Sequence, residues 1–467
     1  MRHLRIYLCM LLLVSVLVSI CSCSIETMIQ PRGRAKLVVI GMDYANSPGA
    51  PNLTGTINDA REIAASFRSV FDAKDIPLDI VWLVQEGYDV QMEVDVTSIS
   101  AFEETLGQVQ RKLEDYSPTF METYILGPYD ARIVVKVPSV DVAQSLTNYF
   151  SEKYPGSPAL VTSRYMSLRD MPDYPSKENI EKTLSEMSVT KDDLLIVYYT
   201  GHGEIYNVAP KAQLYELLKK HSENGTFGED LIQEVMTTVD MYTEENVCGV
   251  LADAGVGGSG YNAFRSDLNK LILQSQLTDG ALITAPTEKD YYYGIFRMTR
   301  LYDILSRMDC SVVTITDACY SGFMAQDSYF GNSVGDALRS FMSIPEWPNV
   351  ASMSASTSAE TSKVTVARNE EGTFQRHSMF TIEVLRKLGW AHTDLKHTYM
   401  TVPFYSFDDA GKAVAEERVI EVPGYQKTIP GRISASDFFD AIMNEWINSG
   451  SQTPQNNTTV KEIYLVP

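Results

Sequence analysis

Short apolar runs alternate with amphipathic stretches along much of the chain. Residues 58–71 place Ile63, Phe67 and Phe71 four positions apart, the spacing of a helix with one buried face. Helical patterns also occur at residues 177–187, which follow the capping residue Ser176, and at residues 300–308. Mostly apolar runs typical of strands buried in a parallel sheet occupy residues 36–42, 78–84, 194–199 and 311–316. This alternation predicts an α/β fold with a mostly parallel central sheet flanked by helices.

Two long stretches interrupt the alternation. Residues 86–159 contain helix patterns at 102–116 and 140–150 around a strand pattern at 131–137, which indicates a small α+β insertion. Residues 205–278 are helical and polar, and we expect a second insertion there. The glycine-rich run Gly255 to Gly260 does not continue into Gly-Lys-Ser/Thr, so we interpret it as a flexible link rather than a phosphate-binding loop.

The N-terminus has the pattern of an export signal. Residues 1–22 carry Arg2, His3 and Arg5, then a long apolar run with no acidic residue. The following Ile20-Cys21-Ser22-Cys23 resembles a bacterial lipoprotein cleavage site, which implies cleavage before Cys23 and lipidation of its thiol. Residues 23–34 then serve as a tether, and we expect the protein on the cell envelope or surface, with secretion as the alternative.

Composition narrows the function. The chain has 467 residues and a formal net charge of −21, which argues against a nucleic-acid-binding protein, because such a protein needs a basic face. Six cysteines in a chain of this length do not make a disulfide scaffold. If Cys23 is lipidated, the mature chain keeps an odd number of other cysteines, so at least one thiol is free.

Two strand ends carry residue types suited to nucleophilic catalysis. His202 lies between two glycines after the apolar run at 194–199, and Cys319 follows the run at 311–316. Ligands of open α/β sheets bind beyond the carboxyl ends of the strands, so neighbouring strands would bring both side chains to one edge. A histidine can take the thiol proton and later protonate a leaving amine.

These motifs resemble those of the caspase-like cysteine peptidases, most closely the metacaspase-like branch, with similarity to clostripain and gingipains. The histidine motif is Tyr199-Thr200-Gly201-His202-Gly203, and the cysteine motif is Asp317-Ala318-Cys319-Tyr320-Ser321-Gly322. The stretch from Leu53 to Ala60 (LTGTINDA) resembles the family's first-helix motif, and Gln452-Thr453-Pro454-Gln455 its C-terminal motif. The resemblance implies a caspase-like peptidase domain over residues 35–467, interrupted by the two insertions.

The resemblance also implies a role for each motif residue. His202 would be the general base and acid, Cys319 the nucleophile, and the backbone N–H groups of Gly203 and Cys319 the oxyanion hole. Asp59, Asp317 and Thr200 would line the pocket for the residue before the cut. Two carboxylates there would favour Arg or Lys. Self-cleavage would then fall at Lys219, Lys220 or Arg265, in the segment between the two catalytic strands.

We expect no metal site from the sequence. His221, His377, His392 and His397 show no ligand spacing with cysteines or acids, and we interpret them as surface or loop residues. Many metacaspases need calcium, and the acid-rich loops would permit it, but no twelve-residue calcium loop is present.

Three functions remain open at this point. The leading hypothesis is an exported cysteine endopeptidase that acts on proteins or peptides through a thioester. The same two residues would also serve a peptide ligase or transpeptidase. The third is a surface interaction protein on a caspase-like scaffold. The sequence does not predict the oligomeric state, and it gives contact with a membrane only through the lipid anchor.

Overall fold

The computed structural model describes residues 33–156, 158–239, 241–322, 349–357, 359–446, 452–457 and 463–466. The predicted signal peptide, most of the tether and Cys23 lie outside these residues. No helix in the described ranges combines the length and the hydropathy that a membrane span requires.

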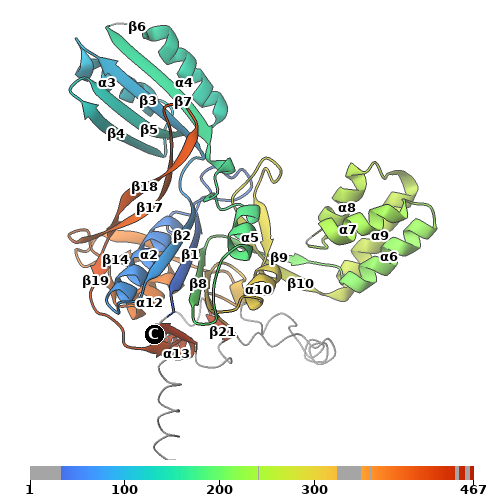
Figure 1. Cartoon of the computed structure of the whole chain (residues 1–467). Helices are drawn as coiled ribbons and strands as arrows, with labels where there is room; N and C mark the ends of the chain where they lie inside the picture. The colour runs from blue at the N-terminus through green and yellow to red at the C-terminus, as the bar shows by residue number, and fades with distance from the viewer. Residues whose placement is uncertain are drawn as a thin grey trace, which may run out of the picture.

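The centre of the molecule is a six-stranded, mostly parallel sheet (Figure 1). Its order is β2-β1-β8-β12-β13-β21, and the last strand alone runs antiparallel to its neighbour. The predicted α/β fold with a mostly parallel sheet is therefore confirmed. The strands are β1 (Ala35–Met42), β2 (Leu78–Gln85), β8 (Leu194–Thr200), β12 (Ser311–Asp317), β13 (Val350–Ser354) and β21 (Gln455–Asn457).

Helices cover both faces of this sheet, so successive strand residues enter different cores. In β1, Leu37 and Val39 pack with α2 and its neighbours, while Val38 and Ile40 pack on the opposite side. Burial on both faces explains why these strands are continuously apolar. The first face is covered by α2 (Thr56–Asp72), α12 (Met379–Lys387) and α13 (Ala435–Glu445), and the second by α5 (Lys177–Ser185) and α10 (Met298–Ser306).

The first interruption folds around a sheet of its own, at the top of Figure 1. Its order, β4-β5-β3-β7-β6, and its two helices make the β-α-β-β-α-β arrangement of a split βαβ unit. A separate core lies between the sheet and the helices. The elements are β3 (Val90–Ser98), α3 (Phe102–Glu114), β4 (Phe120–Gly127), β5 (Asp130–Val137), α4 (Val140–Lys153), β6 (Pro155–Gly156) and β7 (Ala159–Ser167).

The second interruption is a group of four helices inside a hairpin. Strands β9 (Gly203–Asn207) and β10 (Thr278–Thr284) pair antiparallel, and Asn207 lies opposite Thr278. The helices between them share their own hydrophobic core and extend away from the central sheet (Figure 1). They are α6 (Lys211–Glu223), α7 (Glu229–Thr238), α8 (Glu244–Asp253) and α9 (Gly258–Ser275). The glycine-rich run connects α8 to α9 and forms the first turn of α9.

A long hairpin connects the five-stranded sheet to the centre. Its strands are β17 (His397–Phe407) and β18 (Ala413–Pro423). Met400 and Val422 pack into the core around α2, whereas the far end contacts the first insertion, where the Phe407 N–H donates to Glu93. The smaller elements are η1 (Leu168–Asp170), β11 (Gly294–Arg297), β14 (Val364–Arg368), β15 (Phe374–Ser378), β16 (Trp390–Ala391), β19 (Tyr425–Gln426), β20 (Ile433–Ser434) and β22 (Tyr464–Val466).

Candidate active site

Strands β8 and β12 carry the two motif residues to the same edge of the sheet. The strands are parallel neighbours, Thr200 lies opposite Asp317, and the Gly201 N–H donates to the Asp317 carbonyl over 3.2 Å. His202 and Cys319 are each two residues beyond this last pair. Gly203 packs directly on the cysteine segment, because a Cβ there would lie 2.0 Å from the Cys319 carbonyl oxygen. Any larger residue at position 203 would push the two segments apart.

The His202 ring is oriented by a backbone carbonyl. Its Nε2 lies 2.7 Å from the Pro51 oxygen. A carbonyl only accepts, so Nε2 carries a proton, and Nδ1 of the neutral ring is then free to accept one. The backbone of His202 is also fixed, since its N–H donates to the Tyr44 hydroxyl and its carbonyl accepts from Tyr199. A histidine that acts as the base for a nucleophile is commonly held in place by such a hydrogen-bond acceptor.

Cys319 is a half-buried free thiol. Burial raises its pKa, and the charge of Asp317 acts in the same direction, whereas the Ser362 backbone and the Lys363 charge lower it. A thiol of raised pKa needs a proton acceptor before it can attack. Tyr320 follows it with φ of 57°, a left-handed conformation that a bulky residue seldom adopts, and its N–H donates to the Glu360 carbonyl.

Asp317 is buried beneath the thiol. One carboxylate oxygen accepts from Ser362 Oγ at 2.6 Å, and the other accepts from the N–H and Oγ1 of Thr381. Burial, followed by the charge of Asp59, raises the Asp317 pKa to about 7. The charge of Asp59 thus acts on Asp317, while the specificity pocket stays a prediction.

Asp59 is fully buried near the start of α2, with all its acceptor positions directed at one segment. His377 Nδ1 lies 2.7 Å from Oδ1, and the N–H and Oγ of Ser378 both donate to Oδ2. Thr200 is buried as well. The three predicted pocket residues are thus all buried, and the hydroxyls of Ser362 and Ser378 donate to the two carboxylates. Their part in substrate binding stays a prediction.

Two of the four remaining histidines contradict the interpretation as surface or loop residues. His377 is fully buried in β15 against Asp59, and His221 is buried in α6, 3.3 Å from an Asp267 oxygen and edge-on to Phe264. Each side chain contributes to packing that joins residues far apart in the sequence. His392 and His397 are partly exposed.

Two residues with no role predicted from the sequence also shape the site. Pro51 contributes only a main-chain carbonyl, for which no side-chain signal exists. Gln452 belongs to the C-terminal motif. Its side chain accepts from the Lys363 N–H and donates to the Ala355 carbonyl, which fixes the segment that contacts Cys319.

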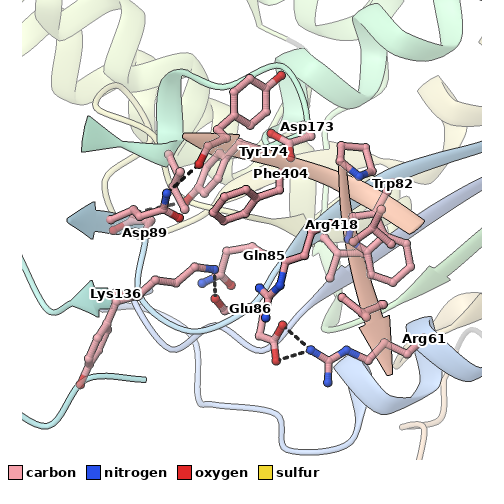
Figure 2. A pocket seen from close by; sticks show the side chains of 18 residues that line it. Arg61, Trp82, Gln85, Glu86, Asp89, Lys136, Asp173, Tyr174, Phe404 and Arg418 are labelled. Carbon is pink, nitrogen blue, oxygen red and sulfur yellow. Dashed lines mark hydrogen bonds and ion pairs between the residues drawn. The ribbon is translucent and has the colours of Figure 1, made fainter. Parts of the chain in front are cut away.

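A separate cavity lies between the end of β2, strand β5 and the β17–β18 hairpin (Figure 2). In its lining, Arg61 pairs with the Glu86 carboxylate, and Lys136 Nζ donates to the Glu86 backbone carbonyl. Burial raises the pKa of Asp173 in this cavity to about 6. The cavity lining includes neither His202 nor Cys319, so we assign it no catalytic part.

The residues expected to be self-cleavage sites lie in regular structure. Lys219 and Lys220 are in α6, and Arg265 is in α9, where it pairs with Glu244. The segment between the catalytic strands is an organised helical unit rather than a loose linker. These helices would have to unfold locally before a peptidase could bind them in extended form.

Among the described residues, one group of three side chains is close enough to share a metal ion: Glu62, His377 and His392. It has two nitrogen donors and is not the all-oxygen set that calcium prefers. The calcium dependence implied by the resemblance stays a prediction.

Comparison with known proteins agrees with the geometry. The caspase domain family matches residues 34–231, a range that contains β1, α2, β8 and His202. No curated protein and no solved structure matches the chain.

Proposed function

We propose that the chain is a cysteine endopeptidase in which His202 and Cys319 form the catalytic dyad. The match of residues 34–231 to the caspase domain family supports a cysteine peptidase in general. The observation that carries the proposal is the register of β8 and β12, which ends both motifs at one sheet edge. The Pro51 carbonyl supplies the orienting contact that such a base needs.

The reaction follows from these groups. His202 Nδ1 takes the proton of Cys319 Sγ, and the thiolate attacks the substrate carbonyl carbon. The N–H groups of Gly203 and Cys319 stabilise the oxyanion. The C–N bond breaks as His202 returns the proton to the amine, which leaves a thioester. Water, deprotonated by His202, then hydrolyses the thioester and frees the thiol.

We place the specificity of the enzyme in the carboxylates below the thiol. Asp59 and Asp317 influence each other electrostatically, so together they would favour Arg or Lys before the cut. The Ser362 and Ser378 hydroxyls would give up their contacts to the entering cation. The export signal and Cys23 support a lipoprotein of the cell envelope, with its peptidase domain outside the cytoplasm.

A peptide library cleaved by residues 24–467, beside the Cys319→Ala protein, tests this function. We expect cuts after Arg and Lys with the wild type only. A preference for Asp or Asn would contradict the acidic pocket but not the dyad. Products joined to an added amine would instead reveal a ligase or transpeptidase, and no product at all would favour an interaction protein.

A further inference from the structure

A cluster outside the dyad has the composition of a transition-metal site. Glu62 projects from α2, His377 from β15, and His392 follows β16. One ligand atom from each lies within 4.8 Å of the other two. Tetrahedral zinc, with bonds of about 2.0–2.2 Å to nitrogen and oxygen, holds its ligand atoms roughly 3.3–3.5 Å apart. Small rotations of the three side chains would therefore bring them to that spacing.

Glu62 and His392 face each other at close range without forming a hydrogen bond. Glu62 Oε2 and His392 Nδ1 lie 2.6 Å apart, yet neither atom has a hydrogen-bond partner in the part of the chain that the structure describes. The two atoms are therefore close, but they do not have the geometry of a hydrogen bond. Glu62 is almost fully buried, so leaving its oxygen without a partner is costly. Two acceptors that face one point are what a cation requires.

The surroundings of His377 support the same interpretation. Its Nδ1 lies 2.7 Å from Asp59, and its Nε2, on the other side of the ring, lies 3.4 Å from Gln375 Oε1 and 3.7 Å from Glu62 Oε1. A metal-binding histidine commonly donates its second ring N–H to a carboxylate, which fixes the tautomer and the ring orientation. Asp59 would be that carboxylate.

We propose that Glu62, His377 and His392 bind one divalent transition-metal ion of the zinc class, with Asp59 as the outer carboxylate. Zinc suits a set of two imidazoles and one carboxylate. One dication would also offset the negative charges of the two buried acids, Asp59 and Glu62. The ion would join α2, β15 and β16 and hold His377 against Asp59, one of the acids of the proposed specificity pocket.

Zinc titration of the untagged chain, residues 24–467, after chelator treatment tests the site. The Cys319→Ala background removes the dyad thiol as a competing ligand. We expect one bound Zn²⁺ per chain and a higher Tm with zinc. His392→Ala and Glu62→Gln should each weaken the affinity at least 100-fold, and Asp59→Asn about 10- to 100-fold, as outer carboxylates typically do.

His397→Ala is the matched control, since this partly exposed histidine pairs with Glu421 outside the cluster. Cobalt substitution adds a readout independent of stability, because a tetrahedral site gives visible absorption that His392→Gln should abolish. Absence of stoichiometric zinc, or zinc retained equally by His392→Ala, His392→Gln and Glu62→Gln, would overturn the proposal. In that case the cluster is a set of direct contacts between His377, His392, Asp59 and Glu62 that joins α2 to the segments around β15 and β16.

Discussion

At the residue scale, the protonation state of Asp317 would set the charge of the proposed specificity pocket. It is buried, it interacts with Asp59, and its pKa is raised to about 7. Near neutral pH the proposed pocket therefore gains a negative charge as the pH rises. The thiol of Cys319 also has a raised pKa, so the nucleophile gains reactivity in the same direction.

The ratio of kcat/KM for two substrates separates the ionisation of Asp317 from that of Cys319. The kcat/KM of an Arg peptide relative to its neutral citrulline analogue should rise about 10-fold between pH 6 and pH 8, because ionised Asp317 binds only the cation. A charge-assisted hydrogen bond is worth about 1.5–3 kcal/mol, and 1.4 kcal/mol is roughly a factor of ten. The thiol titration cancels in the ratio. Asp317→Asn should make the ratio independent of pH, and a flat wild-type ratio would contradict the pocket.

The same carboxyl predicts a pH-dependent stability. Its folded pKa of about 7 lies above the ordinary value of 3.8, so the folded state binds a proton that the unfolded state has lost between these values. Its contribution to stability is full below about pH 4 and falls as the pH rises to 7. Asp317→Asn should therefore raise Tm, relative to wild type, more at pH 8 than at pH 5. Equal differences at both pH values would show that Asp317 is not buried as an acid.

At the element scale, motif residues and single strands were more predictable than the pairing between distant segments. The apolar runs at β1, β2, β8 and β12 lie in the central sheet because burial on both faces leaves a continuous hydrophobic signal. Strand β3 was missed although Val90, Met92, Val94 and Val96 alternate with other residues and are all buried. The residues between them include Gln91 and Glu93, which are polar although the β17–β18 hairpin buries them, so the strand has a period-two pattern instead of a continuous apolar run.

In the candidate active site too, local motifs were easier to predict than contacts between distant segments. Glycine-flanked His202 and Cys319 were recognisable from local motifs, because each motif lies within a few consecutive residues. The Asp59–His377 contact joins residues 318 positions apart, and only the packing of β15 on α2 brings them together. The Pro51 carbonyl is a main-chain group, so no residue type could identify its role.

The four-helix insertion should be dispensable for the dyad. Its helices share a core of their own, Met241 alone among its described, fully buried residues packs against Val208 and Ala281 of the hairpin, and the flanking strands already pair through Asn207 and Thr278. Replacing residues 209–276 with a two-residue Asn-Gly turn, which suits a tight hairpin, should preserve Tm within a few degrees and most kcat/KM for a short peptide. Loss of folding would show that the helices stabilise the hairpin. Cleavage of large protein substrates is the informative second readout, since the helices extend beside the core (Figure 1).

At the scale of the whole molecule, the caspase-like sheet carries two added units, and the sequence predicts an export signal at the N-terminus. Cys23→Ala should move the protein from the membrane fraction to the soluble fraction, because the acyl chains would be its only anchor. Fractionation and the mass of the N-terminal peptide measure this, with Cys248→Ala as the control, since that thiol is buried in the helical insertion. Unchanged fractionation without a lipid mass would reduce the signal to an ordinary secretory one.

The dyad is the central claim, and the most direct measurement compares peptide cleavage by wild type, Cys319→Ala and Cys310→Ala. Cys310 is a free, buried thiol, and burial raises its pKa to about 12. It is therefore a matched control cysteine that stays protonated near neutral pH. We predict that Cys319→Ala keeps the wild-type Tm within a few degrees but lowers kcat at least 10³-fold, while Cys310→Ala keeps most activity. Wild-type turnover by Cys319→Ala would contradict the assignment of the nucleophile.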